Sequence, residues 1–157
     1  MITANVSVLK KELEQCTHEE LIQYCLRLSK FKKENKELLT YLLFEAQNED
    51  FFISSVKEEI DAQFAEINTS SYYFIKKSVR KILSSTKKNI RYSGKKETEV
   101  LLLIYFLKKL KKMKPTFEKN VVLVNTFNTQ LKIVRKKIDT FHEDLQYDFN
   151  MELEEFL

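Results

Sequence analysis

Glycine occurs once in the 157 residues, at position 94, and proline occurs once, at position 115. Sheet-rich folds need many tight turns, and such turns draw on glycine, proline and asparagine where the backbone takes unusual dihedral angles. The scarcity of glycine and proline therefore predicts an all-α fold. We expect a helical bundle or a short irregular stack of helical hairpins, with about five to seven helices and a long C-terminal helix.

The length and composition of the chain predict one folded domain. A chain of 157 residues that is 43% hydrophobic, with 12 Phe and 7 Tyr, can bury a sizeable core. We expect residues 1–157 to form a single all-helical domain. Residues 1–15 have only a weak apolar pattern, which predicts a weakly ordered segment, and residues 150–157 are expected to form an acidic tail.

Local signals place the helices of the first half. Thr17 and Glu20 have the spacing of a capping box, so a helix is expected to begin at Thr17. A polar run between Lys30 and Glu37 interrupts the apolar pattern and favours a break near residues 31–35. A further amphipathic helix is indicated by apolar residues that recur every three or four positions, namely Phe52, Val56, Ile60, Phe64 and Ile67.

The stretch from Tyr72 to Arg91 carries two different surfaces on one predicted helix. The apolar face consists of Tyr72, Ile75, Val79, Ile82, Leu83, Thr86 and Ile90. The other side carries cations within an arc of roughly 140°, without an acidic residue among them: Lys76, Lys77, Arg80, Lys81, Lys87, Lys88 and Arg91. Gly94 follows at the position of a left-handed C-cap. The first face requires burial, and the second requires water or an anion.

Two later segments are expected to supply much of the core. Residues 100–107 are apolar on every side of a helix, which is typical of a helix surrounded by others, and Pro115 stops that helix. From Thr116 onward, mostly alternating spacings of three and four predict one helix of about 30 residues. Its apolar seam is interpreted either as a core-facing stripe or as an interaction surface. The candidate interaction residues are Val124, Leu131, Val134, Ile138, Phe141 and Leu145.

Charge is distributed unevenly along the chain. Residues 1–75 carry a net charge of −5, residues 76–114 carry +12 and residues 115–157 carry −3, within a total of +4. Such a concentration of positive charge attracts polyanions, and phosphate contacts release counterions. We therefore predict a non-enzymatic module with weak, sequence-independent binding of nucleic acid or another polyanion. The candidate residues are Lys77, Arg80, Lys81, Lys87, Lys88, Arg91, Lys95 and Lys96.

Other interpretations of the same patterns are open at this point. The acidic flanks can pair with the basic region inside the monomer, and lysines also favour helix C-termini. An acidic protein partner can use the same cations. The main alternative is a protein-interaction scaffold or a homo-oligomer that uses the C-terminal seam.

The sequence contains no complete motif of familiar enzyme chemistry. One glycine cannot form GxxxxGK[ST] or GxGxxG, and His18 and His142 lack the partner ligands of a zinc or di-iron site. We therefore predict no enzyme activity, no metal, no cofactor and no small-molecule substrate. Cys16 and Cys25 are expected to be free thiols of a reducing compartment, with Cys25 in the core. No apolar run reaches the length of a membrane span, and a cytoplasmic location is expected.

Overall fold

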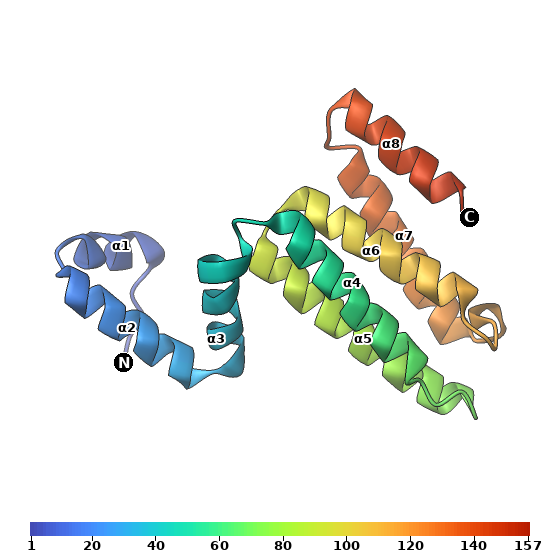
Figure 1. Ribbon diagram of the computed structural model, residues 1–157, viewed down its shortest axis with the longest axis horizontal. Coiled ribbons are helices and arrows are strands. Elements are labelled where there is room, and N and C mark those ends of the chain that lie inside the picture. Colours follow the sequence, from blue (N-terminus) through green and yellow to red (C-terminus); the bar gives the residue numbers. More distant parts are fainter. The chain divides into compact units, whose positions relative to one another are not determined.

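A computed structural model describes residues 1–157. The chain contains eight α-helices and no β-strand, so the all-α class is confirmed and the expected number of helices was slightly too low. Internal contacts group the chain into two compact units, residues 1–45 (unit 1) and residues 46–157 (unit 2), which are coloured in chain order in Figure 1. The expectation of a single domain stays a prediction, because grouping by contacts does not test whether the units fold together.

Unit 1 consists of four short helical segments. They are α1 (Val6–Glu14), α2 (His18–Phe31), α3 (Lys33–Thr40) and a π-helical turn, η1 (Tyr41–Glu45). The capping box at the start of α2 is confirmed, because Thr17 N–H donates to Glu20 Oε2 at 2.8 Å and Glu20 N–H donates to Thr17 Oγ1 at 3.1 Å. The predicted break is also confirmed, since Lys32 has extended dihedral angles (φ −141°, ψ 148°) between α2 and α3.

The helices of unit 1 contain almost no buried surface. None of α1, α2 and α3 has a buried residue. Cys25 is exposed, so its expected place in a core is wrong, although both cysteines are free as predicted. The apolar stripe of α2 is present in the sequence but has no opposing core within residues 1–45.

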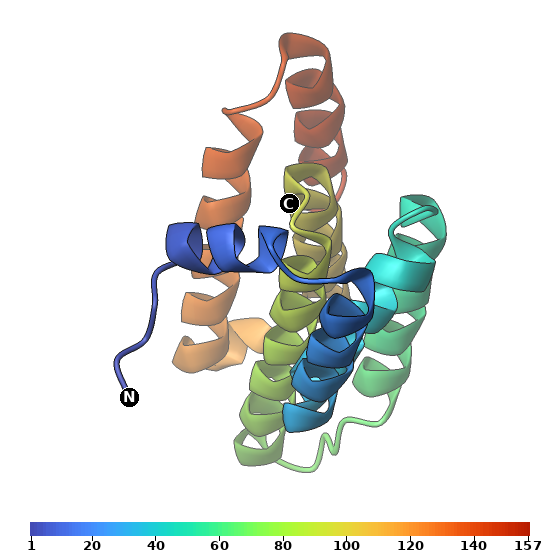
Figure 2. The same cartoon turned by 90° about the vertical axis from the view of Figure 1, so that its left-hand side faces the viewer.

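Unit 2 is built around one central helix. Its helices are α4 (Glu49–Ala65), α5 (Tyr72–Ser93), α6 (Lys96–Lys112), the 3₁₀ turn η2 (Phe117–Lys119), α7 (Val121–Ile138) and α8 (Glu143–Glu154). Helix α6 contacts α4, α5 and α7, and α8 packs against α7. Figure 2 shows α4 and α7 at opposite edges of unit 2, with α5 between them in that view.

The sequence predicted the centre of this core correctly. Eight residues of α6 are buried, namely Thr98, Val100, Leu102, Leu103, Ile104, Phe106, Leu107 and Leu110. They lie on several sides of the helix, because α6 has neighbours on more than one side. The expected stripe of α4 is also largely confirmed, with Phe52, Val56, Ile60 and Ile67 buried.

The expectation of one long C-terminal helix is wrong. Helix α7 ends at Ile138 and α8 begins at Glu143. Local polar groups satisfy the backbone in this turn: Thr140 Oγ1 donates to Lys137 O at 2.7 Å, and Gln146 Nε2 donates to Phe141 O at 2.7 Å. Such side-chain bonds compete with the helical hydrogen bonds and divide a pattern whose spacing alone looks continuous. The acidic residues from 150 onward belong mainly to α8, whose Leu153 is buried.

Candidate polyanion-binding surface

Helix α5 is fixed in unit 2 by its apolar face. Ile75, Val79, Ile82, Thr86 and Ile90 are buried, and the Thr86 hydroxyl donates to Ile82 O at 2.9 Å. Gly94 ends the helix in the left-handed region (φ 67°), as its position predicted. This orientation directs the opposite face of α5 away from the core.

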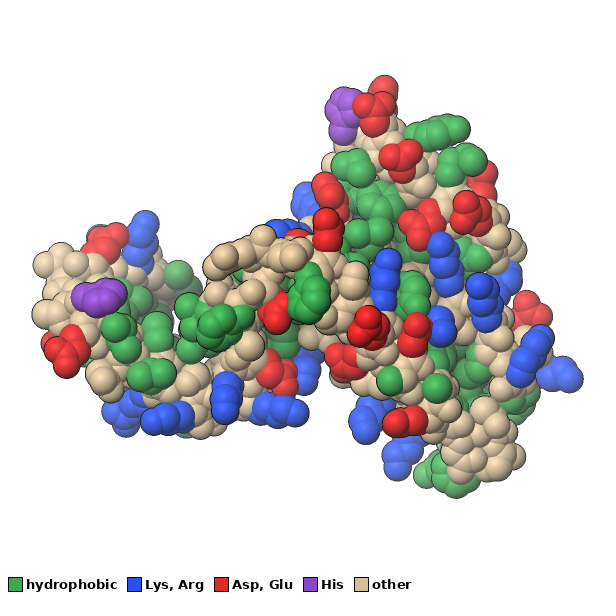
Figure 3. All heavy atoms as spheres, in the orientation of Figure 1, with side chains coloured by type: hydrophobic (Ala, Val, Ile, Leu, Met, Phe, Trp, Pro, Cys, Tyr) green, Lys and Arg blue, Asp and Glu red, His purple; other side chains and the backbone are tan.

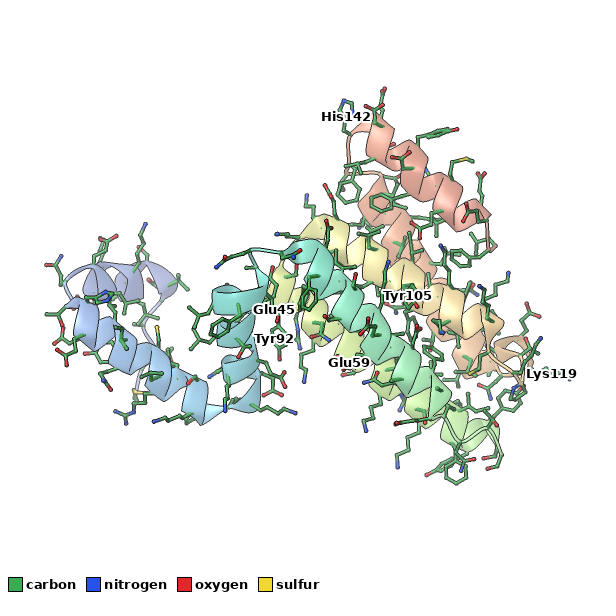
Figure 4. All side chains as sticks on the ribbon, viewed as in Figure 1. Glu45, Glu59, Tyr92, Tyr105, Lys119 and His142 are labelled. Carbon is green, nitrogen blue, oxygen red and sulfur yellow. The ribbon has the colours of Figure 1, made fainter.

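One flank of α5 faces α4 through two uncharged side chains, Ser85 and Asn89, that donate hydrogen bonds to a carboxylate of α4. Ser85 Oγ donates to Glu59 Oε1 at 2.9 Å, and Asn89 Nδ2 donates to Glu59 Oε2 at 3.3 Å. Gln63 Nε2 also donates to Glu59 Oε1, at 3.1 Å. Glu59 lies on α4 (Figure 4). The Glu59 carboxylate is therefore engaged by a hydroxyl and an amide of α5.

The basic arc of α5 lies at the surface. Lys77, Arg80, Lys81 and Arg91 are exposed, and Lys87 is half-buried. None of these five side chains forms an ion pair with an acidic residue of the chain. Lys88, which lies in the same arc, is also half-buried.

The acidic residues of unit 2 pair with cations outside this arc. The ion pairs are Lys95 with Glu49 (3.1 Å), Lys108 with Glu152 (2.7 Å), Lys109 with Asp61 (2.9 Å) and Lys137 with Glu99 (2.9 Å). The interpretation in which the acidic flanks neutralise the basic region thus holds for α6 and for Lys95, but not for the five arc residues. Their positive charges are available to an external anion.

Lys95 belongs to a structural cluster that the sequence did not reveal. Its ammonium contacts Glu49 at the start of α4, and the same carboxylate accepts hydrogen bonds from Ser93 and, at 2.6 Å, from Thr98 Oγ1. Glu49 therefore holds the turn between α5 and α6 against α4. Lys96 is exposed at the first position of α6. Of the eight predicted residues, Lys95 therefore takes part in internal packing, and Lys88 also has a partner within the chain.

A groove runs along the other flank of α5, and no sequence motif indicated it. It has a volume of about 560 Å³ and is lined by α5, α6 and α7, through Arg80, Leu83, Ser84, Lys87, Ile90, Arg91, Glu99, Leu103 and Ile133. The lining combines an apolar floor with three cations at the edge. Leu83 was assigned to the core face, but it is only half-buried. Finding the groove requires knowing that α5 and α7 both pack against α6, and periodicity does not give that information.

The predicted C-terminal seam is divided between two helices. Val134 and Ile138 are buried inside unit 2, and Val124 and Leu131 on α7 are half-buried. In the second half of the seam, Phe141 packs against Phe149, with ring centroids 5.6 Å apart, and Leu145 is half-buried. Much of the seam thus serves the packing of unit 2 itself. Its use by a second copy stays a prediction.

Asp61 and Tyr105 form a pair in which both pKa values are shifted from their ordinary values. The Tyr105 hydroxyl donates to the Asp61 carboxylate at 2.8 Å, and Lys109 contacts the same group at 2.9 Å. Burial, followed by the hydrogen bond and the negative charge of Asp61, raises the pKa of Tyr105 to about 12. Burial alone would raise the pKa of Asp61, but the hydrogen bonds from Lys109 and Tyr105 and the charge of Lys109 outweigh it and lower that pKa. The pair joins α4 to α6, and neither residue belongs to the basic arc of α5; Tyr105 is labelled in Figure 4.

The remaining titratable residues form no further cluster. Three or more His, Cys, Asp or Glu side chains do not come together in an arrangement suited to a metal ion. His142 caps α8, where its Nδ1 accepts from Asp144 N–H at 3.5 Å (Figure 4). None of the helices combines the length and the apolar content needed to cross a membrane.

Comparisons with known proteins give no family for this chain. It matches no family model, no curated protein and no solved structure. Its function has to be argued from its own residues.

Proposed function

We propose that the chain is a non-enzymatic binding module that contacts polyanions, most simply the phosphate backbone of nucleic acid, through the basic arc of α5. The observation that carries this proposal is the absence of acidic partners for Lys77, Arg80, Lys81, Lys87 and Arg91, while Lys95, Lys108, Lys109 and Lys137 are paired. Unpaired cations on one rigid helix present a positive field without a prior cost of breaking internal ion pairs.

The geometry of α5 suits a backbone contact. From residue 77 to residue 91 the arc extends about 21 Å along the helix axis, at about 1.5 Å per residue. Duplex DNA carries one negative charge for about 1.7 Å of its axis, so several phosphates lie within reach of the arc. The arc offers few side chains that read base edges, which favours binding without sequence specificity.

The test is fluorescence anisotropy of labelled single- and double-stranded oligonucleotides at about 50 and about 200 mM salt. With about four phosphate contacts, the affinity is expected to fall about 100-fold between these concentrations. Reversal of two exposed charges, Arg80→Glu with Lys81→Glu, is expected to abolish the binding that remains at low salt.

A matched variant tests whether binding depends on the positions of the positive charges in the arc or only on the net charge of the chain. Lys112→Glu with Lys114→Glu changes the net charge by the same amount at two exposed positions beyond the arc. Its affinity is expected to stay within about threefold of the wild type, because neither lysine lies on the face of α5 that contacts the phosphates and salt screens their charges. Equal weakening by both double variants, or binding that is insensitive to salt, would contradict the proposal.

A further inference from the structure

The groove beside α5 combines two kinds of surface. Its floor is apolar and comes from three helices, with Leu83 on α5, Leu103 on α6 and Ile133 on α7. Its α5 edge carries Arg80, Lys87 and Arg91, none of which has an acidic partner in the chain. Glu99, the one acidic residue of the lining, is already paired with Lys137 at 2.9 Å.

This chemistry fits an amphipathic helix better than it fits nucleic acid. A phosphate backbone gains from the cations but nothing from a floor of leucine and isoleucine. Bases that leave a duplex are held by stacking on aromatic side chains, and no aromatic residue lines the groove. An apolar floor with charges at its edge is the usual receptor for the apolar face of a helix.

The chain already binds one acidic helix in this manner. Helix α8 contains acidic but no basic residues, and it buries Phe149 and Leu153. At its edge, Lys108 pairs with Glu152 at 2.7 Å and lies 5.7 Å from the centre of the Phe156 ring. Apolar residues underneath and a lysine at the margin thus recognise an acidic amphipathic helix.

We propose that the groove between α5 and α7 binds an acidic amphipathic helix of a partner protein. The helix places its apolar residues on Leu83, Leu103 and Ile133 and its carboxylates near Arg80, Lys87 and Arg91. From residue 80 to residue 91 the cations extend over about 17 Å, which corresponds to about three helical turns of the partner. This activity is separate from polyanion binding, although the two share cations.

The experiment uses the full chain and a labelled synthetic peptide with the sequence of residues 143–157, a known acidic amphipathic helix of the right chemistry. A peptide of the same composition with its apolar spacing scrambled serves as the control. Anisotropy and amide chemical-shift mapping of the isotope-labelled chain are the readouts. Shifts are expected at residues 80–91 and at Ile133, and the scrambled peptide is expected to bind about tenfold more weakly.

Two double variants distinguish this proposal from polyanion binding. Leu83→Gln with Ile133→Gln changes the half-buried floor and is expected to weaken peptide binding about tenfold while oligonucleotide binding is kept. Lys77→Gln with Lys81→Gln changes exposed cations outside the groove and is expected to have the opposite effect.

Three results would overturn the proposal. The first is the absence of chemical-shift changes in the wild-type chain at peptide concentrations of about 1 mM. The second is peptide binding by the Leu83→Gln and Ile133→Gln variant that equals the binding by the wild type. The third is a loss of oligonucleotide binding by this variant that is as large as its loss of peptide binding. If the floor variant unfolds in a thermal melt, the shift map of the wild-type chain decides by itself. Shifts that do not include residues 80–91 then count against the groove.

Discussion

Helices α2 and α5 both carry an apolar stripe, but their surroundings differ completely. Helix α2 has no buried residue, whereas α5 buries Ile75, Val79, Ile82, Thr86 and Ile90. Both are amphipathic, so the difference does not come from the stripe itself. It comes from whether another element presents an apolar surface to it.

Unit 2 has such an element, and unit 1 does not. Helix α6 is apolar on most sides, so it serves α4 and α5 together with α7. In residues 1–45 every helix is apolar on one face only, and a unit of this size rarely supports its own core. On the face drawn in Figure 3, hydrophobic side chains lie at the surface of unit 1 over α2 and α3. An amphipathic helix of this chain therefore buries its apolar face where it can pack against α6, which is apolar on most sides.

The largest expected effect comes from removing one core ring of α6. Phe106 is fully buried and lies 5.8 Å from Phe64 between ring centroids. Phe106→Ala leaves a cavity and is expected to lower the free energy of unfolding by about 3–5 kcal/mol. The counterpart in unit 1, Leu26→Ala, removes a side chain that is 44% exposed and is expected to cost less than about 1 kcal/mol. Urea unfolding followed by circular dichroism measures both. Equal costs would mean that α2 is covered in solution and that the comparison between the units is wrong.

The sequence was sufficient where a signal is local. The capping box of Thr17 and Glu20, the break at Lys32, the C-cap at Gly94 and the apolar run of α6 each depend on residues close together in the chain, and all were predicted correctly. Five of the seven residues predicted for the stripe of α5 are buried, and Lys77, Arg80, Lys81 and Arg91 of its basic arc are exposed. Periodicity along one helix determines which side chains share a face.

The sequence was not sufficient where the result depends on contacts between helices. Glu49 is adjacent to Asp50 and gives no sign that it will accept hydrogen bonds from Ser93 and Thr98, which lie 44 and 49 residues away. The groove requires that α5 and α7 pack on α6. The division at residues 139–142 depends on side-chain hydrogen bonds such as that of Gln146, and spacing alone does not reveal them.

A second comparison contrasts a carboxylate that joins helices with one on the surface of a single helix. Glu49→Ala removes the ion pair with Lys95 and leaves the hydroxyl of Thr98, which is 1% exposed, without its acceptor. We expect a loss of about 1–3 kcal/mol. Glu14→Ala in α1 removes the contact of 4.0 Å between Glu14 and Lys10, whose side chains are 58% and 77% exposed. This change is expected to cost at most about 0.5 kcal/mol. Thermal melts of both variants measure the difference, and a large effect of Glu14→Ala would show that α1 is more firmly held than its exposure indicates.

The last comparison concerns pH and the contact between α4 and α6. Because the pKa of Tyr105 is raised from 10.0 to about 12, the folded chain keeps a proton that the unfolded chain loses between these values. The stabilising contribution is therefore complete below pH 10 and falls as the pH rises through this window. For Asp61 the pKa is lowered, so its contribution is present above the ordinary Asp value of 3.8 and is lost as the pH falls through the lower folded value.

Tyr105→Phe tests this linkage against a matched tyrosine. In urea titrations at a series of pH values, the free energy of unfolding of the wild type is expected to fall with pH above pH 10, and Tyr105 contributes up to one proton to that slope. The variant is expected to lack this contribution, because phenylalanine does not ionise. Tyr73→Phe changes a side chain that is 67% exposed and is expected to leave the slope unchanged. An identical slope in all three chains would mean that the Tyr105 hydroxyl ionises as easily in the folded chain as in the unfolded one. The contact between α4 and α6 would then be held by apolar packing, by the ion pair of Lys109 with Asp61 and by the hydrogen bond of Thr98 to Glu49, and not by the Tyr105 proton.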